Sequence, residues 1–203
     1  MIPKVDFQIH EPLIQAFFEP GGHRSVLDAR FKNFIDEFSS QEERILSLIE
    51  KYSGFSWTKD KIPVFLVPDS RMLPTSFAKT ILYGDLPGIV QKVRELNKLR
   101  NLSLFIHELA HINQYQSNFF DDKYNTANKV ERSMHTDRVE LSADIVTLYV
   151  IRELFGENSE YEKDFMDFFE NTSERNKKKG EELKKYLPEW DLNKNPLEHY
   201  LAL

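Results

Sequence analysis

The stretch LSLFIHELAHI, which runs from Leu102 to Ile112, combines an apolar helical pattern with two histidines and a glutamate. Its apolar residues recur every three or four positions, which predicts a helix that packs one face against a core. This face consists of Leu102, Phe105, Ile106, Leu109 and Ile112. The H-E-x-x-H motif within the stretch is therefore expected on a packed helix and not in a surface loop.

His107 and His111 are four residues apart, so both imidazole rings lie on one side of the predicted helix and can reach one ion. Glu108 lies between their directions, beside a water molecule that such an ion would hold. This spacing is typical of metal-assisted hydrolysis. The longer pattern H-E-x-x-H-x-x-G-x-x-H is not met, because Gln114 and Ser117 occupy the places of its glycine and third histidine.

A second segment starts at Glu140-Leu141-Ser142-Ala143-Asp144 and is apolar on nearly every face as far as Phe155, which predicts a buried helix. A carboxylate buried there needs a cation or a strong donor, because an unpaired buried charge is costly. Glu140 and Asp144 are four residues apart and share a face. We therefore expect Glu140 to be the third metal ligand and Asp144 to accept the second ring N–H of a ligating histidine.

Two alternatives concern this third ligand. The residues from Asp137 to Glu140 also fit a capping box at the start of a helix, with Asp137 as the N-cap. Glu131 is the rival third ligand, although its polar surroundings from Lys129 to Arg138 are typical of a solvated turn or a helix end.

H-E-L-A-H followed by E-L-S-A-D resembles the gluzincin group of zinc metallopeptidases. The resemblance spans about Ile62 to Phe155, rests on two short motifs, and is greatest to the compact members of the group. It implies an α+β, zincin-like fold in which a small sheet packs on the H-E-x-x-H helix and on a buried E-x-x-x-D helix, with additional N- and C-terminal helices. It also implies one Zn²⁺ per chain, with the metal ligands His107, His111 and Glu140, the general base Glu108, and Asp144 behind the ligands.

The reaction implied is hydrolysis of a peptide or protein substrate. The ion lowers the pKa of its water towards about 7, and Glu108 takes a proton and delivers it to the leaving nitrogen. No motif identifies the donor that stabilises the oxyanion. The candidates for it are His135, Tyr149, His199 and Tyr200.

Two other classes of function remain open. One is a zinc-binding or regulatory protein that keeps the ligands but hydrolyses no peptide. The other is a metal-free helical interaction protein in which H-E-L-A-H arose by chance.

Composition favours one globular domain over residues 1–203, because 203 residues with 40% hydrophobic content can bury a sizeable core. The expected domain comprises a motif core at about 62–155, a helical part at about 1–60, and a charged helix and tail at about 157–203.

The absence of cysteine excludes disulfides and thiolate ligands. The net charge of -6 argues against nucleic acid as a partner, and the basic run Lys177 to Lys179 is expected on a solvated helix face. No membrane span or secretory signal is recognisable, so a cytoplasmic location is expected.

Periodicity also predicts the remaining elements. Strands are expected at Val5 to Ile9, 62–67 and 76–83, and helices at 25–38 and 41–52. A further helix is expected through Val90 and Leu99. Asn101 is expected to cap the H-E-x-x-H helix that follows. The stretch 114–137 is expected to form a polar insert that walls the active-site cleft or lies on the surface. Ser159 should cap a helix, and a charged helix should follow over 171–185, interrupted near Gly180.

Overall fold

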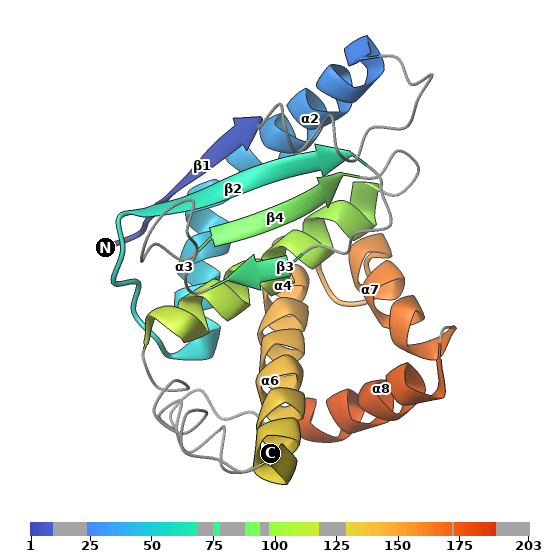
Figure 1. Cartoon of the computed structure of the whole chain (residues 1–203). Coiled ribbons are helices and arrows are strands. Elements are labelled where there is room, and N and C mark those ends of the chain that lie inside the picture. The colour runs from blue at the N-terminus through green and yellow to red at the C-terminus, as the bar shows by residue number, and fades with distance from the viewer. Residues whose placement is uncertain are drawn as a thin grey trace.

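The computed structural model describes residues 1–9, 24–68, 75–77, 88–93, 98–117, 129–171 and 173–189, and gives only the backbone for 68, 75–77, 98, 129–137, 175 and 189. The architecture is α+β, and helices predominate (Figure 1). The elements are β1 (Lys4–Ile9), α2 (Arg24–Ser39), α3 (Glu42–Ser53), β2 (Lys61–Pro68), β3 (Thr75–Phe77), β4 (Gly88–Val93), α4 (Lys98–Gln116), α6 (Lys129–Phe155), α7 (Glu160–Glu170), α8 (Glu174–Tyr186) and a short 3₁₀ turn, η1 (Leu187–Glu189).

The four strands form one sheet in the order β1-β2-β4-β3. β1, β2 and β4 are parallel, with Phe7 opposite Val64 and Phe65 opposite Val90, whereas β3 pairs antiparallel with β4. A parallel pair needs a long crossover connection, and between β1 and β2 this crossover contains α2 and α3. In Figure 1, α4 runs along one face of the sheet and the long helix α6 crosses α4.

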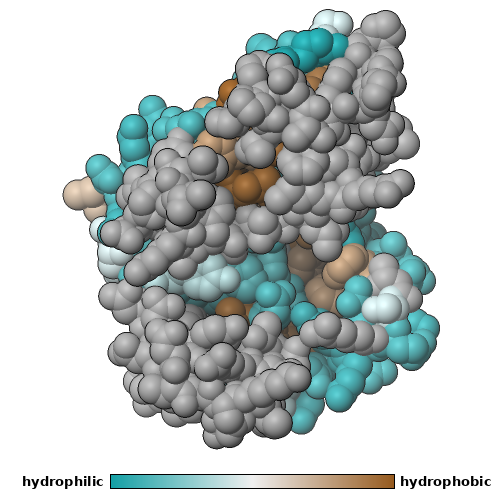
Figure 2. All heavy atoms as spheres, in the orientation of Figure 1, coloured by the Kyte–Doolittle hydropathy of each residue, from teal (hydrophilic) through white to brown (hydrophobic). Residues whose placement is uncertain are grey.

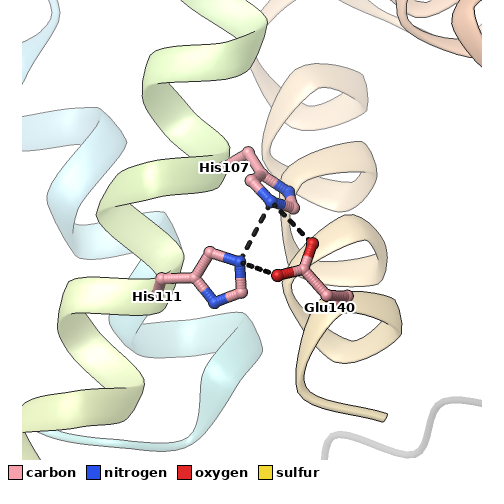
Figure 3. Close-up of side chains that lie close together, drawn as sticks. All are labelled: His107, His111 and Glu140. Atoms are coloured by element: carbon pink, nitrogen blue, oxygen red, sulfur yellow. Dashed lines mark hydrogen bonds and ion pairs between the residues drawn. The ribbon is translucent and has the colours of Figure 1, made fainter. Parts of the chain in front are cut away.

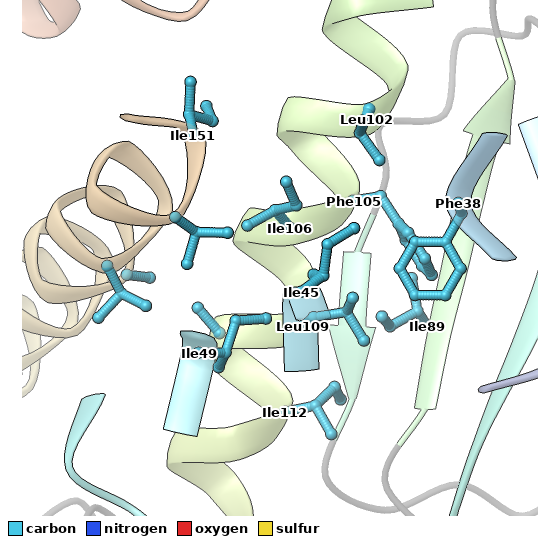
Figure 4. Packing of buried hydrophobic residues seen from close by; sticks show 14 of the residues in the cluster. Phe38, Ile45, Ile49, Ile89, Leu102, Phe105, Ile106, Leu109, Ile112 and Ile151 are labelled. Atoms are coloured by element: carbon cyan, nitrogen blue, oxygen red, sulfur yellow. The ribbon is translucent and has the colours of Figure 1, made fainter. Parts of the chain in front are cut away.

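The core lies between the sheet and α4, and it continues from α4 to α3 and α6 (Figure 4). All five residues of the predicted apolar face of α4 are fully buried, which confirms that prediction. Each such side chain contributes about 1.5 to 3 kcal/mol on leaving water. On the second helix, Ile145, Val146, Leu148, Val150 and Ile151 are buried in the same cluster, as the sequence predicted. The core thus fixes α4 and α6 against each other.

Polar contacts also hold α4 to the end of α3 and to the connection that follows it. Asn113 of α4 donates a hydrogen bond to the carbonyl oxygen of Phe55 at 2.9 Å and accepts one from the Ser53 hydroxyl at 2.6 Å. Asn113 and Ser53 are buried, so satisfying their polar groups avoids a desolvation cost. The rotation of α4 about its axis is therefore fixed by hydrogen bonds as well as by packing.

The sequence predictions are confirmed, to within one or two residues at each end, for β1, α2, α3 and β2. The Ser159 cap is also confirmed, because its hydroxyl accepts from the Glu162 amide at the start of α7. Of the strand predicted at 76–83, residues 76 and 77 lie in β3, and the rest lie outside the described residues.

The helix predicted through Val90 and Leu99 is wrong, because Gly88–Val93 form β4 in the interior of the sheet. The spacing of Val90 and Val93 suits a helix, but the run Ile89, Val90 and Val93 is β-branched and pairs with strands on both sides. Pairing with β2 and β3, which the local sequence does not reveal, overrides the helical spacing.

Three predicted boundaries are also wrong. Asn101 does not cap the H-E-x-x-H helix α4, because α4 begins at Lys98 and Asn101 is buried within it. Asp137 is no N-cap, because α6 already begins at Lys129 and takes in the end of the predicted polar insert. Gly180 does not interrupt α8, which is continuous over Glu174–Tyr186.

None of the helices in the described part of the chain is long and apolar enough to cross a membrane. The face of the molecule in Figure 2 is mainly hydrophilic at the lower right, where α8 lies. Lys177 and Lys178 of α8 are exposed, as the sequence predicted, whereas Lys179 is half-buried.

Candidate metal centre

α4 and α6 bring His107, His111 and Glu140 together, with their ligand atoms converging on one point (Figure 3). The two Nε2 atoms are 3.0 Å apart. Glu140 Oε1 lies 3.4 Å from His111 Nε2, and Glu140 Oε2 lies 3.7 Å from His107 Nε2. The histidines come from successive turns of α4, and the glutamate comes from the facing side of α6.

These separations suit a small divalent ion. An ion bound tetrahedrally at 2.0 to 2.1 Å from each ligand atom places its ligand atoms about 3.3 Å apart. The three observed distances of 3.0, 3.4 and 3.7 Å bracket that value. Small shifts of the side chains would be enough to coordinate the ion.

Hydrogen bonds determine which nitrogen of His111 faces the other ligands. The Ser142 hydroxyl donates to the Val139 carbonyl at 2.8 Å, so its oxygen accepts from Gln114 Nε2, also at 2.8 Å. The Gln114 Oε1 atom then faces His111 Nδ1 at 3.2 Å, and it can only accept. His111 Nδ1 therefore carries a proton, which directs Nε2 toward the other ligand atoms.

His107 has a carboxylate on its far side. Asp144 Oδ1 lies 3.0 Å from His107 Nδ1, and Asp144 is only 5% exposed. The ring N–H is not well aligned with that oxygen, since Nδ1 is buried without a hydrogen bond of good geometry. The contact is close enough for the carboxylate to favour a proton on Nδ1, which leaves Nε2 as the nitrogen that faces Glu140.

The result is two Nε2 atoms that point at each other. If both Nδ1 atoms keep their protons and the rings are neutral, two lone pairs meet at 3.0 Å, which is repulsive. A cation between them, a metal ion or a proton, removes this repulsion. The donor chemistry of the cluster therefore fits a bound metal ion.

The electrostatics of the cluster agree with this conclusion. Burial alone would lower the pKa of His107, but the charge of Asp144, with contributions from Glu140 and Glu108, raises the pKa well above its ordinary value of 6.5. For Glu140, burial alone would raise the pKa, but hydrogen bonds and charges from His107 and His111 bring the pKa well below the ordinary range. The site attracts positive charge.

Glu108 is buried on the same helix, with 8% of its surface exposed. It follows His107 directly in the chain, and its charge helps to raise the pKa of that histidine. A carboxylate whose charge acts on one of these histidines is a candidate for proton exchange with a molecule bound at the cluster.

Tyr149, one of the proposed oxyanion donors, is directed elsewhere. Its hydroxyl donates to the carbonyl of Leu187 in η1 at 2.8 Å, and its ring stacks on Tyr52. Burial raises the pKa of Tyr149, partly offset by Arg152. Of the other proposed donors, the side chain of His135 is not described, and His199 and Tyr200 lie outside the described residues.

The rival ligand Glu131 lies nine residues before Glu140 in the same helix. At 1.5 Å per residue, their backbones are about 13 Å apart along the axis of α6. This separation favours Glu140 as the carboxylate that completes the cluster with the two histidines.

Sequence reasoning missed three residues around the cluster. Gln114 faces His111, and Ser142 accepts a hydrogen bond from Gln114. The signal for Gln114 was its position one turn after His111 on a largely buried helix. The third is Lys179 of α8, whose Nζ lies 3.8 Å from Glu140 Oε2. No local pattern links Lys179 to Glu140, which precedes it by 39 positions.

Comparison of the chain with models of known families, with characterised proteins and with solved structures gives no match. The residues of the cluster and their geometry are therefore what indicate a function for this chain.

Proposed function

We propose that this chain is a zinc-dependent peptide hydrolase with a zincin-like fold. The observation that carries the proposal is the convergence of His107 Nε2, His111 Nε2 and the Glu140 carboxylate, with separations of 3.0 to 3.7 Å. Catalytic zinc sites commonly use three protein ligands of this kind and leave a fourth position open. The chain has no cysteine, so nitrogen and oxygen ligands are the ones available, and imidazole with carboxylate suits zinc.

Zinc held at this site would acidify a water molecule and polarise the carbonyl group of a peptide. Glu108 would accept the proton of the water and pass it to the leaving nitrogen. Asp144 and Gln114 would keep the two imidazole rings in the orientation that presents Nε2. In the described sheet β3 is an edge strand, and an extended peptide could add to it as a further strand near α4.

Metal content is the first test of the proposal. Purified wild type should hold about one zinc per chain, and Glu140→Ala should lose it. Glu174→Ala is the matched control, because Glu174 is an exposed acidic residue of α8 whose ion-pair partner is Lys177. Elemental analysis without added metal gives the answer. An equal zinc content in wild type and Glu140→Ala would show that Glu140 is not a zinc ligand.

Hydrolysis is tested separately with Glu108→Gln, a change that keeps the size of the side chain and removes its basic oxygen. The variant should bind zinc like wild type and cleave no member of a peptide library that wild type cleaves. Chelation should stop cleavage by wild type, and zinc should restore it. Cleavage by Glu108→Gln at the wild-type rate would show that Glu108 is not the general base. Zinc-loaded wild type that cleaves nothing would favour a metal-binding protein without peptidase activity.

A further inference from the structure

Lys179 of α8 lies beside the candidate metal centre. Its Nζ lies 3.8 Å from Glu140 Oε2, and its side chain is 20% exposed. The neighbouring Lys177 is 48% exposed and pairs with Glu174 at the surface. Lysine favours full hydration, so a half-buried ammonium beside a ligand carboxylate indicates a specific contact.

The packing of α8 determines where Lys179 lies. Gly180, the next residue, allows close approach to α7, because a Cβ atom there would lie 2.7 Å from the Phe169 Cβ. Leu183 is fully buried, and the hydrogen bond from Tyr149 to Leu187 joins α6 to the turn after α8. The backbone at Lys179 is thus placed near Glu140 by contacts that do not involve the Lys179 side chain itself.

A fixed positive charge at this place has two consequences once a divalent ion is bound. If Glu140 Oε2 ligates the ion, Nζ lies within about 6 Å of it, since the ion is about 2 Å from that oxygen. At this distance the ammonium repels the ion and weakens its binding. The same ammonium adds to the positive potential around the open position of the ion, where an anionic ligand is then favoured over a neutral one.

We propose that Lys179 is a specificity-determining residue of the metal centre, which selects ligands that carry a negative charge beside the atom bound to the ion. The chemical class comprises carboxylates, hydroxamates and the oxyanion that forms during hydrolysis. The inference rests on the metal site of the proposed function, but it concerns ligand charge and needs no cleavage.

Metal and anion affinities should change in opposite directions in Lys179→Met. Zinc affinity, measured by competition with a chromophoric chelator, should rise about tenfold because a repelling charge is removed. The affinity of the Co²⁺-loaded protein for acetohydroxamate, followed in the visible absorption of the metal, should fall about tenfold. Affinity for imidazole, a neutral ligand, should stay within a factor of about two.

Two control variants separate charge from structure. Lys179→Arg keeps the positive charge and should retain both wild-type affinities, and Lys177→Met removes an exposed charge of the same helix and should change neither. Loss of both affinities in Lys179→Met would show a purely structural role and overturn the inference, as would no change in either. Wild type that binds metal and acetohydroxamate but cleaves no peptide would overturn hydrolysis alone, and wild type that binds no metal would overturn both.

Discussion

At the scale of single residues, the candidate site is defined by what lies behind each ligand. His111 has Gln114 behind it, His107 has Asp144, and Glu140 has Lys179. Gln114 is placed to accept from the ring N–H of His111, and the Asp144 carboxylate lies close to His107 Nδ1, so both favour a proton on Nδ1 and keep Nε2 available. Lys179 differs from them, because it carries the same sign of charge as a metal ion would.

Asp144→Ala should weaken zinc binding by about 10- to 100-fold while the protein stays folded. The change removes the carboxylate 3.0 Å from His107 Nδ1 and leaves the three ligands in place. Zinc affinity is measured by competition with a chromophoric chelator. Wild-type affinity in this variant would mean that Asp144 does not orient His107.

Gln114→Ala should likewise lower zinc affinity by about tenfold, because His111 Nδ1 loses its acceptor. Ser142→Ala is the comparison. It removes the hydroxyl that accepts from Gln114 Nε2 but keeps the Gln114 oxygen that faces the ring, so its effect should be the smaller. The same competition measurement ranks the two variants, and a larger loss in Ser142→Ala would contradict the assignment of the His111 tautomer.

At the scale of elements, contacts between helices distant in sequence complete the fold. Tyr161 of α7 donates a hydrogen bond to Glu37 of α2 at 2.8 Å, and its ring stacks on Phe155 at the end of α6. Burial, with the hydrogen bond and charge of Glu37, raises the pKa of Tyr161 from 10.0 to about 12.

This shift predicts a loss of stability in alkaline solution. The native state keeps the Tyr161 proton more tightly than the unfolded chain does, so its contribution is full below pH 10 and is lost as the pH rises from 10 to about 12. Tyr161→Phe keeps the stacked ring and removes the proton. Urea unfolding at several pH values should show a shallower decline for Tyr161→Phe than for wild type, and parallel declines would contradict the prediction.

Some elements could be predicted from sequence because their signals are local. The apolar faces of α2, α3 and α4 recur at helical spacing, and Ser159 with Glu162 marks the start of α7. β4 could not be predicted, because Val90 and Val93 suit either structure and pairing with β2 decides between them. Likewise, H-E-L-A-H and E-L-S-A-D predicted which residues meet at the site, but Lys179 lies beside Glu140 only because α8 packs against α6 and α7.

At the scale of the whole molecule, the candidate metal site lies between the central helices α4 and α6, so a bound ion would join them. A ligand that binds only the folded chain stabilises it by about 2.7 kcal/mol at a free concentration 100 times its Kd. For a chain of this size, this raises the Tm by about 5 to 10 °C. Scanning calorimetry with and without zinc should show this rise in wild type and none in the double variant His107→Ala, His111→Ala. An equal rise in both would place the bound zinc elsewhere.

The two faces of α4 contact different parts of the molecule. Leu102, Phe105 and Leu109 are wholly buried in the core, whereas His107 faces Glu140 and Asp144 across the gap to α6. Substitutions on the histidine side should act mainly through the candidate metal site, and substitutions on the core side should act mainly through packing. In evolutionary terms, a lineage that exchanged the histidines could keep the apolar repeat of this helix, and with it the packing of α4 against the sheet.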